Sequence, residues 1–129
     1  MAKKEFLFKG KNLEELKTLS IREFAELLPS RQRRSLITRG LTEQEKILLK
    51  KIDAGKNNIK THCRDMLIIP EMAGADIKVH RGTKEWVLVN ITEDMVGHYL
   101  GEFAQTRQKV SHSAPGIGAT RSSAAISVR

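Results

Sequence analysis

Apolar residues recur at helical spacing through the first half of the chain, between residues 12 and 54. The clearest stretch is "SIREFAELLPS", where Ser20 and Glu23 form a capping box at the start of a helix. Pro29 ends this helix, because the residue before a proline is pushed out of the α region. The apolar residues that share one face of it are Ile21, Phe24, Ala25 and Leu28.

Three more helix starts surround this stretch. Asn12 precedes "LEEL", and Ser30 can cap a helix through "RQRRSLITRG" that closes at Gly40. Thr42, with a glutamate three residues on, opens a further helix that closes before Gly55. The pattern predicts short helices with small apolar stripes and charged outer faces.

The pattern changes at residue 56. "GKNNIKTHCR" is polar and irregular, which indicates a connector, and "DMLIIP" is a short apolar run stopped by Pro70, which we expect to be the first strand. "ADIKVHRGTKEWVLVNI" predicts two strands around a turn at 81–84, with Gly82 at its permissive position. Trp86 lies in a nearly continuous apolar run and is expected in the core. Three strands with helices on one face predict a small α+β fold.

The last quarter of the chain loses this periodicity. Thr92 is expected to cap a short helix, and two glycines in "GHYLGEF" prevent a long one. No apolar period follows Thr106. We therefore expect a helical basic N-terminal extension over 1–55, an α+β core over 56–106 and an extended basic tail over 107–129.

Charge follows the same three parts. The chain has 129 residues and a formal net charge of +8. Residues 1–60 carry 15 Lys and Arg against 8 Asp and Glu, residues 61–105 carry 4 against 7, and residues 106–129 carry 4 against none. A basic excess at both ends favours a polyanionic partner, most commonly nucleic acid. Cys63 is the only cysteine, and no stretch approaches the roughly 20 apolar residues of a membrane span, so we expect a reducing, cytoplasmic location and no membrane.

Motifs for catalysis are weak. The step Gly116-x-Gly118 has no third glycine and no preceding strand, so it does not predict a dinucleotide site. His62 and Cys63 are adjacent and diverge, and a lone cysteine cannot build a zinc site, so neither metal nor cofactor is expected. The remaining enzymatic alternative is an RNA-processing or nucleotide enzyme that uses His98 or His112.

Three basic clusters carry the nucleic-acid hypothesis, and they lie on the "RQRR" helix, just before the expected first strand, and in the tail. A solvated helix face explains many charge runs, but the arginines favour phosphate, which a guanidinium binds bidentately. Aromatic residues are few, so we expect phosphate and shape contacts with little base readout. A free-standing duplex binder stays an alternative. The clusters are Arg31, Arg33, Arg34 and Arg39; Lys60, His62 and Arg64; and Lys109, Arg121 and Arg129.

Two longer stretches, "KTHCRDMLIIPEMAGADIKVHRG" and "VNITEDMVGHYLGEFAQTR", carry a family resemblance. The chain resembles the small-subunit ribosomal protein family called S-nineteen in bacteria and S-fifteen in eukaryotes. "LLPSRQRRSL" and "PGIGATRSS" are similar to its archaeal and eukaryotic branch, and the resemblance runs from about Leu13 to Ser123.

The resemblance implies a non-catalytic protein in the head of the small ribosomal subunit, bound to ribosomal RNA beside ribosomal proteins thirteen and fourteen. Its tail would point toward the decoding region and the transfer RNAs. Asp65 stands where bacterial relatives are basic, so an RNA contact there is not expected. The acidic residues of the middle segment are expected to face a basic neighbouring protein. The residues expected to bind RNA are Arg31, Arg33, Arg34, Lys60, Thr61, His62, Arg64, Arg107, Lys109, His112 and Arg121.

Overall fold

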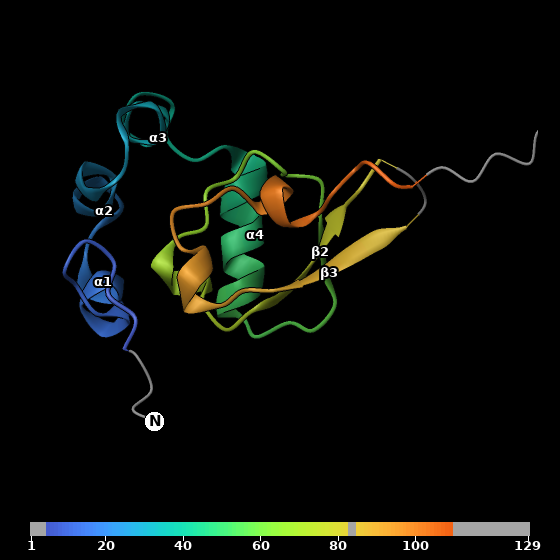
Figure 1. The fold of residues 1–129 in the computed structure, drawn as a ribbon, viewed down its shortest axis with the longest axis horizontal. Helices are drawn as coiled ribbons and strands as arrows, with labels where there is room; N and C mark the ends of the chain where they lie inside the picture. Colours follow the sequence, from blue (N-terminus) through green and yellow to red (C-terminus); the bar gives the residue numbers. More distant parts are fainter. Residues whose placement is uncertain (1–4, 83–84, 110–129) are drawn as a thin grey trace, which may run out of the picture.

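The computed structural model describes residues 5–82 and 85–109 (Figure 1). The helices are α1 (Leu13–Thr18), α2 (Ile21–Leu27), α3 (Ser30–Arg34), the π-helical turn η1 (Ser35–Arg39) and α4 (Glu43–Asp53). The strands are β1 (Ile59–Thr61), β2 (Asp76–His80) and β3 (Trp86–Asn90). Short 3-10 turns complete the order at η2 (Pro70–Met72), η3 (Glu93–Met95) and η4 (Leu100–Phe103). The predicted α+β class, with a three-stranded sheet, is confirmed.

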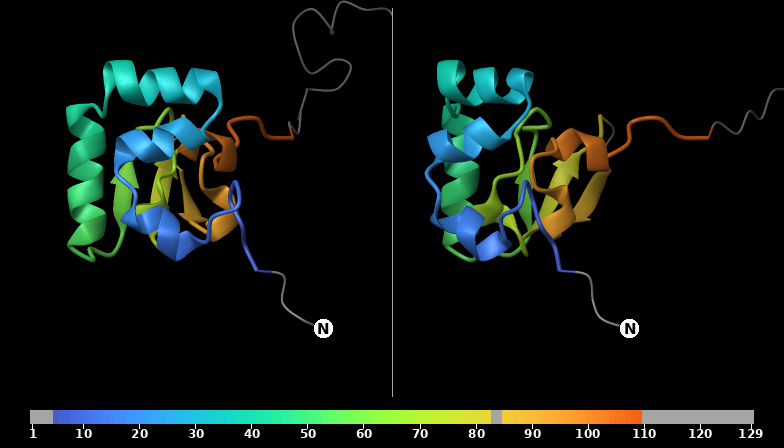
Figure 2. Two further views of the ribbon diagram at one scale, coloured as in Figure 1. Left: turned by 90° about the vertical axis from the view of Figure 1, so that its left-hand side faces the viewer. Right: turned by 60° about the vertical axis from the view of Figure 1, so that its left-hand side comes forward.

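The sheet has the order β1-β2-β3, with β2 parallel to β1 and antiparallel to β3. Alternate side chains of a strand point to opposite faces, so each strand gives one set to the core and one to the outside. The buried set is Ile59, Thr61, Ile77, Val79 and Val89. The other set forms a surface that we call the open sheet face: Lys60, Asp76, Lys78, His80, Trp86, Leu88 and Asn90. In Figure 1 the four helices lie together to one side of β2 and β3, and Figure 2 shows α1 and α2 in front of the sheet from that side.

The expected first strand at "DMLIIP" is wrong, because β1 lies earlier, at Ile59–Thr61. The apolar run is extended, but it makes only an isolated bridge, from Leu67 to Tyr99. Its amide at Ile68 donates to the His98 carbonyl at 2.8 Å. Met66 to Pro70 are all buried, so the run is enclosed by the protein on every side. This burial explains why the run is uninterrupted and does not alternate.

Two hydrophobic clusters hold the fold together. The larger one joins the inner face of the sheet to Leu48 and Leu49 of α4. The smaller one combines Leu16, Phe24 and Leu28 of the N-terminal helices with Leu67 and Val96 of the later segment. The N-terminal helices therefore share their core with residues far along the chain. The expected three-part division at residues 55 and 106 remains a prediction.

Helix boundaries follow local signals in most places. Ser20 and Glu23 form the expected capping box, and Leu28, with φ −85° and ψ 158°, leaves the helix before Pro29. Ser30 does not cap α3 as expected, because the extended Pro29 takes the N-cap position and Ser30 is the first helical residue. The helix widens into η1 and ends at Gly40, whose φ is 68°.

The element after Thr92 differs from the expectation in kind. The expected helix is the single 3-10 turn η3, and the threonine side chain makes no capping hydrogen bond. The stretch "GHYLGEF" forms only the short 3-10 turn η4, in line with the expectation that its glycines prevent a long helix. Gly82 has φ 94°, as expected for the turn after β2.

Candidate nucleic-acid interface

Four side chains gather at one end of the open sheet face. His80 at the end of β2 pairs in register with Trp86 at the start of β3, and His62 follows β1 directly. Ring centroids lie 4.3 Å apart for His62 and His80, 5.1 Å for His80 and Trp86, and 5.0 Å for His62 and Trp86. The ammonium of Lys60 lies over the indole, 5.5 Å from its centroid. We call these four residues the ring cluster.

The expectation that Trp86 belongs to the core is wrong. Trp86 is only partly buried and belongs to neither hydrophobic cluster. Its position follows from the register, because Val79 and Val87 form the neighbouring pair and occupy the inner face. Leu88 continues the outer face with 54% of its surface exposed. Sequence reasoning missed this aromatic surface because its rings come from three separate strands.

The segment after Phe103 lies against the same end of the sheet, where it runs past the hairpin end of β2 and β3 in Figure 1. The side chain of Arg81, next to His80, holds this segment to the sheet. Its guanidinium donates to the carboxamide oxygen of Gln108 and lies 3.9 Å from the Glu85 carboxylate. Gln108, which lies between the exposed Arg107 and Lys109, is thereby held at the hairpin end of the sheet.

Two residues expected to bind RNA have inward-facing polar groups. The Arg64 guanidinium donates to three main-chain carbonyls: His80 at 2.7 Å, Gly101 at 2.9 Å and Ala104 at 2.7 Å. Thr61 is 6% exposed, and its hydroxyl oxygen accepts a hydrogen bond from the Cys63 amide. Arg64 thus ties the end of β2 to η4. The polar groups of both residues are bonded within the protein, and their contact with RNA remains a prediction.

The arginines of α3 differ in whether their guanidinium groups are bonded within the protein. Arg33 folds back, and its guanidinium donates to the carbonyls of Glu26 and Leu28 at the end of α2. Arg31 and Arg34 are exposed, and neither side chain makes an ion pair with another residue in 5–82 or 85–109. These two guanidinium groups are available to a phosphate partner.

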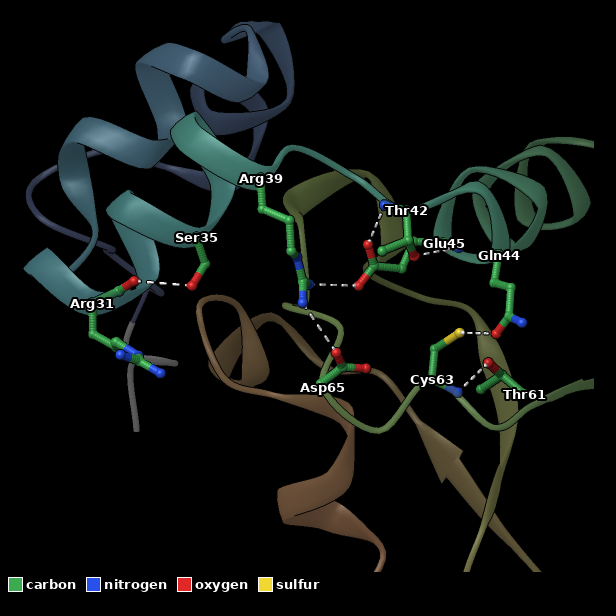
Figure 3. A network of polar contacts seen from close by, with 9 residues as sticks. All are labelled: Arg31, Ser35, Arg39, Thr42, Gln44, Glu45, Thr61, Cys63 and Asp65. Atoms are coloured by element: carbon green, nitrogen blue, oxygen red, sulfur yellow. Dashed lines mark hydrogen bonds and ion pairs between the residues drawn. The ribbon is translucent and has the colours of Figure 1, made fainter.

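Arg39, the fourth arginine of this stretch, is part of a polar network (Figure 3). Its guanidinium lies 3.4 Å from the buried carboxylate of Glu45 and 3.4 Å from the exposed carboxylate of Asp65. Glu45 also accepts the amide hydrogen of Thr42 at 2.7 Å, which completes the capping box of α4. The network joins η1, α4 and the segment before the apolar run, so Asp65 has an intramolecular partner. Cys63 faces α4, with its thiol 3.7 Å from the Gln44 carboxamide oxygen.

The groups of the enzymatic alternative lie at the surface. His98 Nδ1 is 2.8 Å from a Glu102 carboxylate oxygen, and the two side chains are 54% and 46% exposed. A histidine and a carboxylate so open to water form a hydrogen-bonded pair at the surface and not an enclosed catalytic pocket. Among residues 5–82 and 85–109 there is no group of three His, Cys, Asp or Glu side chains placed to hold a metal ion. His112 and Arg121 lie outside the described residues.

No helix in the described part of the chain is both long and apolar enough to cross a membrane.

Comparison with known proteins decides the family. Residues 32–112 match the family model described as Ribosomal protein S19. The chain belongs to the ribosomal protein S19 family. A relative from the archaeon Methanocella arvoryzae, the "Small ribosomal subunit protein uS19", is 52% identical over 121 residues, which cover 94% of this chain and 85% of that protein.

Membership in the S19 family confirms the resemblance in the sequence. It also confirms the expectation of a structural, non-enzymatic protein located on the ribosome in the cytoplasm. The described surface is of the kind that such a protein needs. It has exposed guanidinium groups on α3 and a ring cluster with a lysine on the sheet.

Proposed function

We propose that this chain is a structural component of the head of the small ribosomal subunit and binds its ribosomal RNA at two separate surfaces. The first surface is formed by Arg31 and Arg34 on α3. The second is the hairpin end of the sheet, with Lys60, Arg107 and Lys109. These surfaces lie at opposite ends of the described molecule (Figure 1). A protein with two cationic ends can hold two RNA segments in a fixed relation to one another.

The observation that carries the proposal is the division among the α3 arginines. Arg33 is committed to carbonyls of α2, whereas the exposed Arg31 and Arg34 have no ion-pair partner among the described residues. Guanidinium groups bind phosphate bidentately, and each phosphate neutralised releases counterions. Membership in a ribosomal protein family supports ribosomal RNA as the polyanion that these groups bind.

A third surface suits a protein neighbour. Glu5, Glu93 and Asp94 line a hollow together with apolar side chains that include the 59% exposed Leu7, and none of the described residues that line it is a Lys or Arg. We propose that this hollow faces a basic head protein, such as ribosomal protein thirteen or fourteen. Two other acidic side chains of the middle segment already have partners within the protein, since Glu85 pairs with Arg81 and Glu102 with His98. The tail over 107–129 is proposed to extend toward the decoding region and transfer RNA, and most of it lies outside the described residues.

The test replaces Arg31 and Arg34 with glutamine and measures binding to small-subunit ribosomal RNA across a salt series. The variant should bind more weakly, and the slope of log affinity against log salt should flatten by about one unit for each phosphate that is no longer neutralised. Arg33→Gln is the matched control. It should lower the unfolding temperature, because α2 loses two hydrogen bonds, and leave the salt slope unchanged.

Migration in a sucrose gradient tests the assembly itself. The tagged chain should travel with small subunits at low salt and be released only by strongly dissociating salt. If the double variant keeps the full salt slope, α3 is a solvated surface and the first RNA contact has to be withdrawn. If the chain never migrates with subunits, the whole proposal fails.

A further inference from the structure

The open sheet face has an unusual composition for a surface exposed to water. The outer face of a half-covered sheet is normally polar. Here the face carries a tryptophan, His80 and a leucine that is 54% exposed, and His62 lies beside its end. Its other members are polar or charged: Lys60, Asp76, Lys78 and Asn90. Three rings lie within 5.1 Å of one another, centroid to centroid, and a lysine ammonium lies over the indole. Such a surface suits a flat, electron-rich group with a negative charge attached.

We propose that the ring cluster of Lys60, His62, His80 and Trp86 binds an unpaired base of RNA by stacking, with the neighbouring phosphate held by the cations around it. This inference rests on the proposed function, since it names the kind of nucleotide that the hairpin end of the sheet recognises. It departs from the expectation of phosphate and shape contacts with little involvement of bases.

The chemistry around the rings favours a nucleotide over an apolar protein segment. Lys60 lies over the indole, Lys78 continues the same face, and Arg81 follows His80 directly. The contact between Arg81 and Gln108 holds the segment that carries the exposed Arg107 at the hairpin end of the sheet. Stacked bases need a ring surface and their backbone needs cations, and single-strand binding surfaces combine these two elements.

The site is held in place by the fold. Arg64 donates a hydrogen bond to the His80 carbonyl at 2.7 Å and so fixes the end of β2. The His80 ring nitrogen Nδ1 accepts the Gly82 amide hydrogen at 3.2 Å, which orients the imidazole. The parallel register of β1 and β2 places His62 beside His80. Rings ordered before binding lose little conformational entropy when a base is stacked on them.

The base has to be unpaired because a base within a helix has both faces covered by its neighbours. Loops, bulges and strand ends of a folded RNA supply such bases. Every base has a π face, so stacking alone distinguishes little between sequences. We therefore expect the site to select an exposed base over a paired one, with weak preference for base identity.

Trp86 is the only tryptophan of the chain, so its fluorescence reports on this site directly. The full chain is titrated with a 12-nucleotide oligoadenylate and with a blunt 12-base-pair RNA duplex at the same salt concentration. We expect saturable quenching by the single strand and little change with the duplex. Affinity for labelled single strand, measured by anisotropy, should fall about 5- to 150-fold in Trp86→Leu, the range expected when one base can no longer stack.

Two further variants keep the test decisive if Trp86→Leu folds poorly. His62→Ala changes an exposed side chain and retains the tryptophan, so it should weaken single-strand binding several-fold and reduce the maximal quenching. Trp86→Phe should retain part of the affinity, because a smaller ring still stacks. Thermal unfolding of each variant serves as the folding control.

The outcomes separate this inference from the proposed function. If neither RNA binds and ribosomal RNA is not retained, the proposed function fails. If Trp86→Leu and His62→Ala both bind RNA with full affinity, and RNA leaves the tryptophan fluorescence of the wild-type chain unchanged, the proposed function stands and the stacking site is refuted. If the two variants bind RNA normally but no longer enter subunits, the face docks a protein and the inference is again wrong.

Discussion

Replacement of Arg64 by methionine tests whether this arginine supports the fold or contacts RNA. The methionine side chain has comparable length and keeps the apolar stem, but it removes the guanidinium group. Three main-chain carbonyls, at 2.7 Å, 2.9 Å and 2.7 Å, then lose their donor. Two of these belong to Gly101 and the fully buried Ala104, where water replaces the donor poorly.

The magnitude follows from these three bonds. A hydrogen bond contributes about 0.5–1.5 kcal/mol net, and somewhat more when one partner is charged. Because Arg64 is only half-buried, we take about 1 kcal/mol for each bond and expect a loss of about 3 kcal/mol. A loss of 1 kcal/mol lowers the unfolding temperature by roughly 4–8 °C in a domain of 60–100 residues and by roughly 2–4 °C in one of 150–250 residues. For a chain of 129 residues we take about 4 °C and expect the unfolding temperature to fall by about 12 °C.

The assay is urea and thermal denaturation followed by circular dichroism. The urea midpoint should fall while the m value is unchanged, since the native surface stays the same. Arg107→Met is the matched control, because Arg107 is exposed, and it should change the stability by no more than about 0.5 kcal/mol. An unchanged unfolding temperature, combined with weaker RNA binding and a flatter salt slope, would place Arg64 on a phosphate and refute this reasoning.

Three further substitutions test other contacts. Glu23→Gln should destabilise α2 at neutral pH, because hydrogen bonds from the Ser20 amide and hydroxyl hold the pKa of Glu23 below its usual 4.5. The stabilisation by the ionised carboxylate is complete above pH 4.5 and is lost as the pH falls through the lowered pKa. Acid denaturation curves of the variant and the wild type should therefore converge at low pH. Arg39→Met should cost about 1–2 kcal/mol in urea denaturation, because a buried carboxylate on α4 loses its cation, and no loss would show that the network is incidental. In Gly101→Ala the new methyl carbon would lie 2.9 Å from the Arg64 carbonyl oxygen, so the backbone has to shift, and we expect a loss of about 1–3 kcal/mol in thermal unfolding, whereas unchanged stability would mean that the segment yields freely.

Local signals in the sequence were enough for the helices. Ser20 and Glu23 lie three residues apart and contact each other directly, so the capping box can be read without knowledge of the fold. Pro29 and Gly40 act through their own backbone preferences, and both end helices where expected. These features depend on neighbours within one turn.

The first strand was misplaced because its evidence is tertiary. β1 has three residues, too few for an alternating pattern to stand out. The run from Met66 to Ile69 looks more like a strand, but it owes its apolar character to burial between two clusters. Only the pairing of β1 with β2 distinguishes the two stretches.

The candidate RNA-binding site can be predicted only in part from the sequence, again because part of its evidence is tertiary. Charge identified α3, but it could not show that Arg33 reaches back to α2 while Arg31 and Arg34 face outward. The ring cluster needs the register of all three strands. The sequence does contain a pattern that places Lys60 and His62 on one face, because they alternate with the buried Ile59 and Thr61. This pattern can be recognised only when the position of β1 is known.

The hydrogen bonds of Arg64 also set the order in which the newly made chain can fold on the ribosome that synthesises it. Their acceptors at Gly101 and Ala104 lie 37 and 40 residues downstream. The main-chain hydrogen bonds of Met66 and Ile68 likewise need partners that are made later, at Leu100 and His98. The helices emerge first and can form locally, whereas the core closes only after residue 104 has been added. During that interval a basic helical segment and an uncovered apolar run are exposed together. The nascent chain is therefore most prone to aggregation just before the core closes, and early binding of RNA to α3 would keep it soluble at that stage.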